Sequence, residues 1–195
     1  MSRLKCRLPI VAIGAGALLL ACGGSDPSDD ALSLGGQSGF LAELDVQDDV
    51  TLACSGSATA RPIGFEDIDG VVALPTSPTH PALHASARTA TDGSTYYFAK
   101  TGLLWTAPAV FELSVPADLR SSMAIGWGGP AQAAHTVKMS CDDDTAWVSL
   151  PGGYWVTEPM CADLIVSVKG VEQTVRIGLG EACAGQDPPQ GQTDG

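Results

Sequence analysis

The sequence predicts an all-β protein whose folded part is an antiparallel β-sandwich of about eight strands. Apolar and polar residues alternate with a period of two in several segments between residues 50 and 183. Glycine, proline, serine and aspartate separate these segments at short intervals, as turns do. Beyond the N-terminal apolar run, no segment keeps a convincing helical period, which favours a sandwich or barrel.

The expected strands follow one another along the chain with short connections. They cover residues 50–54, 95–100, 110–115, 123–127, 136–141, 146–150, 164–168 and 174–179. The last two are joined by Lys169 and Gly170 and form the clearest hairpin, because alternating segments flank a residue pair suited to a tight turn.

The N-terminus is typical of an export signal. Basic residues at Arg3, Lys5 and Arg7 precede an apolar run over 8–20, and small residues follow it. A helix needs roughly 20 residues to cross a bilayer, so a permanent membrane span is the weaker interpretation of this shorter run. We therefore expect residues 1–21 to be a cleaved signal peptide.

The end of this signal, Leu19, Leu20, Ala21 and Cys22, resembles the lipobox of bacterial lipoproteins. The resemblance implies that the Cys22 thiol receives diacylglycerol and that cleavage follows Ala21. The chain would then be held on the outer face of the cell membrane by lipid on Cys22, since two acyl chains give stable anchoring. An ordinary secretory signal, with Cys22 there by coincidence, is the alternative.

Charge limits the partners that the chain can bind. The formal net charge is −12, and removal of three basic residues with the signal takes it to −15. Nucleic acid is therefore excluded as a partner, because phosphate binding depends on neutralisation by Lys and Arg.

Two polar segments flank the expected sandwich domain of residues 50–183. Residues 22–49 are interpreted as a flexible acidic tether, within which 40–49 are ambiguous because Phe40, Leu41 and Leu44 could form a short helix or docking segment. Residues 184–195 contain two prolines and three glycines, a composition that predicts a disordered tail.

Four cysteines remain in the folded part, and an oxidising compartment favours disulfides. Three pairings are open. Cys161 and Cys183 bracket the predicted hairpin, so we favour Cys161–Cys183 together with Cys54–Cys141. A metal site is disfavoured because no CxxC occurs and no histidine stands at ligand spacing from a cysteine, and no cofactor is expected.

Two resemblances concern the folded part. Residues 50–56, Val-Thr-Leu-Ala-Cys-Ser-Gly, look like the B strand of an immunoglobulin domain, which implies immunoglobulin-like general architecture. The family's tryptophan is missing, however, and Pro159 stands where its tyrosine would precede Cys161. Segments 98–104, 125–128, 151–156 and 175–180 with Cys183 resemble a family of secreted actinobacterial proteins of unknown function, which implies no activity.

Aromatic residues beside glycines are the candidate binding residues. Trp127 lies in the run 126–129, and Tyr154 and Trp155 follow Gly152 and Gly153. Exposed aromatic rings on a rigid scaffold bind sugars and peptides well. The alternative is that these rings fill the core while the glycines form bulges and turns.

Catalytic residues are not identified. Neither GxSxG nor SxxK occurs in the sequence. His80 and His84 are four apart, but their surroundings favour a loop pair over a metal site, and His135 is expected on an edge strand. The acidic run 142–144 could bind calcium but is more typical of a solvated turn.

These patterns favour a lipid-anchored, non-enzymatic protein of the cell envelope that presents a binding surface to a protein, peptide or glycan. The alternatives are an envelope hydrolase, using His80, His84 or the 142–144 run, and a structural accessory subunit. Exposure of Trp127, Tyr154 or Trp155 would support the first hypothesis, convergent carboxylates and histidine the second, and a large apolar patch the third.

Overall fold

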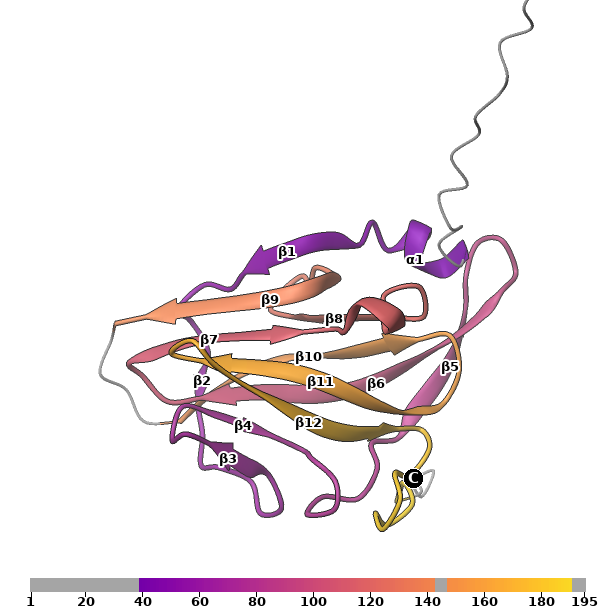
Figure 1. Cartoon of the computed structure of the whole chain (residues 1–195). Coiled ribbons are helices and arrows are strands. Elements are labelled where there is room, and N and C mark those ends of the chain that lie inside the picture. The colour runs from indigo at the N-terminus through magenta and orange to yellow at the C-terminus, as the bar shows by residue number, and fades with distance from the viewer. Residues whose placement is uncertain (1–38, 143–146, 191–195) are drawn as a thin grey trace, which may run out of the picture. The chain divides into compact units, whose positions relative to one another are not determined.

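Twelve strands and two short helical segments make up residues 39–142 and 147–190, the part of the chain that the computed structural model describes (Figure 1). The elements are α1 (Gly39–Glu43), β1 (Gln47–Thr51), β2 (Ser57–Ala58), β3 (Glu66–Ile68), β4 (Val72–Leu74), β5 (Ala85–Thr89), β6 (Thr95–Trp105), β7 (Ala109–Ser114), a 3-10 turn (Ala117–Leu119), β8 (Met123–Trp127), β9 (Ala134–Cys141), β10 (Val148–Val156), β11 (Met160–Val168) and β12 (Val171–Leu179). The predicted all-β class is confirmed. The signal segment and Cys22 lie outside the described residues.

The twelve strands form one hydrogen-bonded sheet. The prediction of about eight strands was therefore too low. The order is β12-β11-β7-β9-β8-β10-β6-β4-β3, with β1 added to β9, β2 to β10 and β5 to β6. Every pairing of named strands is antiparallel except that of β1 with β9, which is parallel. The prediction missed β2, β3, β4 and β5, which are short or carry no clear alternation.

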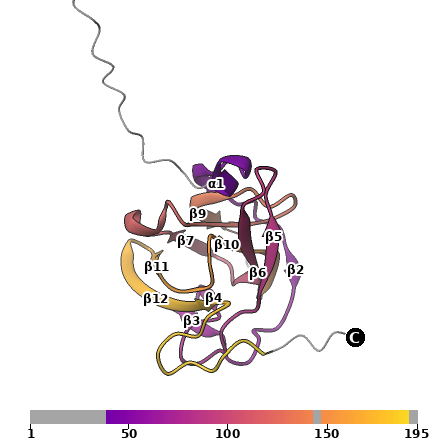
Figure 2. The same cartoon turned by 90° about the vertical axis from the view of Figure 1, so that its right-hand side faces the viewer.

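The sheet curls around its main core. Figure 2 shows the strands end-on, with β11 and β12 on one side and β5 and β6 on the other. The segment after β4 reaches the free edge of β12, where Leu83 N donates to Gly178 O (2.8 Å) and Gly180 N to Leu83 O (2.8 Å). These bonds connect the segment after β4, which lies near one end of the strand order, with β12, which lies at the other end.

Side chains from almost every long strand meet on the inner face of the sheet. The largest that are fully buried there include Trp105, Tyr154, Phe111, Met123 and Met139. A smaller cluster lies against the sheet elsewhere and joins Phe40 and Leu41 to Ala90, Ala124, Ala133 and Trp155. The sheet is therefore covered by apolar side chains in two places.

The folded part begins earlier than predicted. Phe40 and Leu41 of α1 are buried, and Phe40 stacks on Tyr96 with ring centroids 5.0 Å apart. After α1 the chain continues into β1, which pairs with β9 from Gln47 onward. Residues 39–49, which the prediction placed in the tether, are part of the domain because two large apolar side chains dock on the sheet.

The folded part also ends later than predicted. Gln186, in the segment expected to be a disordered tail, is only 8% exposed. Its side-chain Oε1 accepts from Cys183 N (3.0 Å), and its Nε2 donates to His80 O (2.7 Å). Residues 184–190 therefore belong to the ordered domain, held by polar bonds that composition does not reveal. No helix within the described ranges is long and apolar enough to cross a membrane.

Candidate functional site

The predicted aromatic binding surface is wrong. Trp127 and Tyr154 are 2% and 0% exposed and lie in the main core, and Trp155 is 9% exposed and lies in the smaller cluster. The physical reason is the place of β10 in the sheet, between β8 and β6. Because its alternate side chains enter the two apolar clusters, neither of its aromatic rings is left for a ligand.

The three rings have core contacts instead. Trp127 and Tyr154 form an edge-to-face pair with centroids 5.3 Å apart, and Trp155 lies 5.0 Å from Phe98. Trp127 Nε1 donates to Thr101 O (3.2 Å). The hydroxyl of Tyr154 has no hydrogen-bond partner among the described residues, and burial raises its pKa far above the ordinary value.

Two disulfides join the cysteines in the pairing that the sequence favours. Cys54 is bonded to Cys141 and Cys161 to Cys183, with Cα–Cα distances of 5.5 and 5.0 Å. The first links the end of β9 to the chain after β1, and the second links the start of β11 to the chain after β12. These four thiols are therefore not available as ligands or nucleophiles.

His135 is not on an edge strand, as the sequence analysis expected. It is buried near the start of β9, which has neighbours on both sides, and its Nε2 donates to Arg120 O (3.1 Å). Burial lowers its pKa. It lies in a different element from His80 and His84, which follow β4.

Only the first residue of the acidic run 142–144 lies within the described residues. Asp142 is exposed, and Asp143 and Asp144 fall outside the described residues. Nowhere in the described ranges do three or more His, Cys, Asp or Glu side chains gather in a way that could hold a metal ion.

The structure brings His80 and His84 to one groove, which is the candidate site. The groove has a volume of about 460 Å³. It is lined by Ile63, Gly64, Thr79, His80, Pro81, Ala82, Leu83, His84 and Gln190. We call this the His80 groove. It combines an apolar floor with two imidazoles, a hydroxyl and an amide, a mixture typical of sites that orient a ligand.

The walls of the His80 groove come from three separate stretches of chain. Residues 63–64 precede β3, residues 79–84 lie between β4 and β5, and Gln190 belongs to the C-terminal segment. Gln186 ties the second stretch to the third through its bond to His80 O, and Ala82 N donates to Asp187 O (2.9 Å). Phe65 packs edge-on against His80, with ring centroids 5.2 Å apart, and ties the first to the second.

The hydrogen bond of His80 sets the chemistry of its ring. Its Nδ1 lies 2.6 Å from Pro81 O, and because a carbonyl only accepts, Nδ1 carries the proton. The Nε2 of a neutral His80 is then an acceptor. The groove can accept a hydrogen bond at this nitrogen and donate one from the Gln190 amide, which suits binding of a peptide backbone.

Ile63 is the groove residue that sequence reasoning missed. It is 99% exposed, and it stands between Pro62 and Gly64 in a connecting segment. An isoleucine enclosed by proline and glycine is a weak signal of an apolar side chain that a loop holds outward. Gln186 was also missed, because nothing in the sequence marks it as buried.

Comparison with protein-family models, with curated proteins and with solved structures finds no match for this chain.

Proposed function

We propose that this chain is a lipid-anchored, non-enzymatic protein of the cell envelope whose His80 groove binds a protein or peptide partner. The N-terminal segment with Cys22 supports the anchor, and the four cysteines of the folded part, bonded in two pairs, are in keeping with an oxidising compartment. The acidic composition is in keeping with a partner other than nucleic acid.

The observation that carries the proposal is the full exposure of Ile63 beside the groove. An isoleucine loses about 1.5–3 kcal/mol of hydrophobic free energy when it stays in water instead of being buried. Pro81 and Leu83 continue the apolar surface within the groove, and His80 and His84 add polar contacts. A partner that covers this surface would recover the burial of Ile63.

A glycan is less suited to this groove than a protein or peptide. Sugar rings stack on exposed aromatic faces, and the three rings that could have served, Trp127, Tyr154 and Trp155, are buried. We keep the immunoglobulin-like sandwich as part of the proposal at the level of general architecture, since the antiparallel strands enclose an apolar core and leave loops to carry the binding site.

Crosslinking on intact cells, with mass spectrometry of the products, tests this proposal. The full chain is compared with Ile63→Asp and with Val171→Asp, which changes another exposed apolar residue, 66% exposed, outside the groove. We expect one crosslinked species to fall by at least about tenfold in Ile63→Asp, because a buried unpaired charge is costly, and to persist in Val171→Asp.

Equal loss or equal retention of the crosslinked species in both variants would contradict a role for the groove.

In parallel, Cys22→Ser tests the anchor by membrane fractionation. We expect it to release the chain or leave it unprocessed, and continued acylation with membrane retention would contradict the anchor alone.

A further inference from the structure

The strand β5 has an open edge that starts where the His80 groove ends. Residues 85–89 pair with 95–99 of β6, and no other named strand pairs with β5. In Figure 1 the β5–β6 hairpin extends beyond the other strands at the right of the view. His84 lines the groove and β5 begins at the next residue, so the groove and the open edge are continuous.

The register shows which backbone groups of β5 point outward. Ala90 N donates to Ser94 O across the hairpin (2.9 Å). Because bonding alternates along an antiparallel strand, the even-numbered residues of β5 bond to β6 and the odd-numbered ones point the other way. Ala87 and Thr89, which are exposed, therefore present their N–H and C=O groups on the outward side.

The protein itself pairs the outward groups at both ends of this stretch. Leu83 has the same orientation and is bonded to β12 through Gly178 O and Gly180 N (2.8 Å each). Thr91 N, at the other end, donates to the carboxylate of Glu43 in α1 (2.6 Å). The stretch between Leu83 and Thr91 is about 27 Å long at the rise of a strand. It is long enough for an added strand of about five residues.

Charge distinguishes β5 from other edge strands. The edge strand β1 carries Asp48 and Asp49, and β3 carries Glu66 and Asp67, and such charges oppose the addition of another strand. The one charged residue of β5 is Arg88, which is exposed and forms no salt bridge within the described ranges. In a chain with a net charge of −12, this cation favours an incoming carboxylate.

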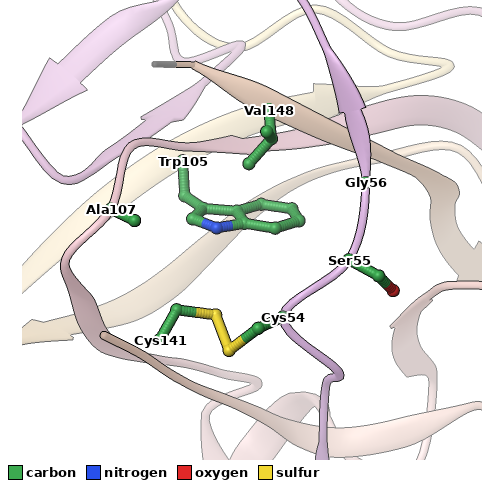
Figure 3. Close-up of a pocket in the computed structure, with 7 residues that line it drawn as sticks. All are labelled: Cys54, Ser55, Gly56, Trp105, Ala107, Cys141 and Val148. Carbon is green, nitrogen blue, oxygen red and sulfur yellow. A yellow bond between two sulfur atoms is a disulfide. The ribbon is translucent and has the colours of Figure 1, made fainter. Parts of the chain in front are cut away.

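The far end of β6 is covered by the chain, unlike the edge of β5. Figure 3 shows the segment after β1 passing beside Trp105, the last residue of β6, with the Cys54–Cys141 disulfide on the other side of the indole. This segment continues into β2, which pairs with the start of β10. A Cβ at Gly56 would lie 2.9 Å from Ser149 O, so the segment packs closely against β10.

We propose that the partner of the His80 groove is an extended peptide segment that adds to β5 as a further strand and places a carboxylate opposite Arg88. This inference rests on the proposed function, because one partner fills the groove and continues along β5. The incoming backbone bonds to Ala87 and Thr89. Directly opposite residues of paired strands share a face, so the acidic side chain meets Arg88. Strand addition derives affinity from main-chain bonds and specificity from alternate side chains.

Titration of the full chain with the peptide acetyl-Val-Thr-Glu-Thr-Val-amide tests the proposal in a ¹⁵N–¹H correlation spectrum. We expect saturable downfield shifts of the Ala87 and Thr89 amides, with a dissociation constant in about the millimolar range for so few hydrogen bonds. The amides of Ser86 and Arg88 face β6 and should move less. The same peptide with lysine in place of glutamate should bind about 2- to 10-fold more weakly, because its charge repels Arg88.

Two variants of one residue test the backbone bonds. Ala87→Pro removes an outward N–H and leaves the bonds to β6, as proline does on the open side of an edge strand. It should abolish the shift at Thr89, whereas Ala87→Ser keeps the N–H and should bind like the unchanged chain. A peptide with both threonine nitrogens methylated should not bind to the unchanged chain. That peptide keeps the test valid if Ala87→Pro does not fold.

Strand addition is overturned if the Ala87 and Thr89 amides do not shift, if the glutamate and lysine peptides bind equally, or if Ala87→Pro retains the shift. Crosslinking on intact cells separates this inference from the proposed function. Loss of the crosslinked species in both Ile63→Asp and Ala87→Pro supports the two together. Loss in Ile63→Asp alone overturns strand addition and leaves the groove as the binding site, and loss in neither variant overturns both.

Discussion

The Tyr154 hydroxyl lies in the main core, where it has no hydrogen-bond partner among the described residues. Burial of an unpaired hydroxyl costs about 1–3 kcal/mol by mutational measures. We therefore expect Tyr154→Phe to leave the free energy of unfolding unchanged or raise it by up to about 2 kcal/mol. Denaturant unfolding measures this change, with Tyr97→Phe at a half-buried tyrosine of β6 as the control.

The same substitution changes the response to alkaline pH. Burial raises the pKa of Tyr154, so its contribution to stability is complete below the unfolded pKa of about 10 and is lost as the pH rises above it. Between pH 10 and 11.5, stability should fall less steeply in Tyr154→Phe than in the unchanged chain. Parallel slopes in the two proteins would show that Tyr154 is not buried as described.

Among single residues, the sequence drew attention to the aromatic side chains but did not show that they are buried. Trp127 stands in a strand that was predicted, whereas Tyr154 and Trp155 lie beyond the predicted strand 146–150, in the part of β10 that the prediction missed. Even within a correctly predicted strand, period two only assigns alternate residues to opposite faces. In this sheet both faces near β10 are covered, because α1 and the β5–β6 hairpin supply the smaller apolar cluster. That covering depends on contacts between distant parts of the chain, so local patterns could not reveal it.

Among the elements, the segment 76–84 has no regular structure of its own and depends on Gln186. In Gln186→Ala, His80 O loses its donor and Cys183 N loses its acceptor. We expect a loss of about 1–3 kcal/mol, because Cys183 is buried and its N–H is left unpaired. Guanidinium unfolding measures the loss, with Gln173→Ala at an exposed position of β12 as the control.

Hydrogen exchange locates the effect of that change. The amides of Ser77 and Leu83 donate to Arg176 O and Gly178 O across the gap to β12. If Gln186 holds the segment against β12, both amides should exchange faster in Gln186→Ala, while amides in the middle of β10 should not. Uniform acceleration throughout the sheet would mean that Gln186 acts on global stability alone.

Strands and turns differ in how well they can be predicted from their own residues. The β11–β12 hairpin was predicted because alternating segments flank Lys169 and Gly170, and in the structure both residues take positive φ, 51° and 82°, as a two-residue turn requires. In contrast, β3 and β4 are three residues each and are held by pairing with each other and with β6. The His80 groove follows from such pairing, so its histidines could be named from the sequence but not placed together with Ile63.

For the whole molecule, the long-range connections are two disulfides that close loops of different length. Cys54 and Cys141 are 87 residues apart, and Cys161 and Cys183 are 22 apart. Their pairing could be favoured from the sequence because one pair brackets a hairpin. The single curled sheet could not be predicted in the same way, because alternation of apolar and polar residues does not say which strands become neighbours.

The chain-entropy description predicts which bond matters more. A longer closed loop restricts the unfolded chain more, so the cost of removal is about 4.6 kcal/mol for Cys54–Cys141 and about 3.4 kcal/mol for Cys161–Cys183. Unfolding of Cys54→Ala with Cys141→Ala should therefore show about 1 kcal/mol more destabilisation than unfolding of Cys161→Ala with Cys183→Ala. Guanidinium midpoints with equal slopes would make the comparison direct.

The opposite order would place the main effect in the folded state instead of the unfolded one. Cys183 is buried and its backbone N–H is bonded to Gln186, so loss of the shorter bridge could loosen the C-terminal segment as well. Adding Gln186→Ala to each cysteine pair separates the two causes. If the shorter bridge acts only through the unfolded chain, Gln186→Ala should lower the free energy of unfolding by the same amount in both double cysteine variants. If the shorter bridge holds the C-terminal segment, Gln186→Ala should lower it only in the variant that lacks Cys54–Cys141.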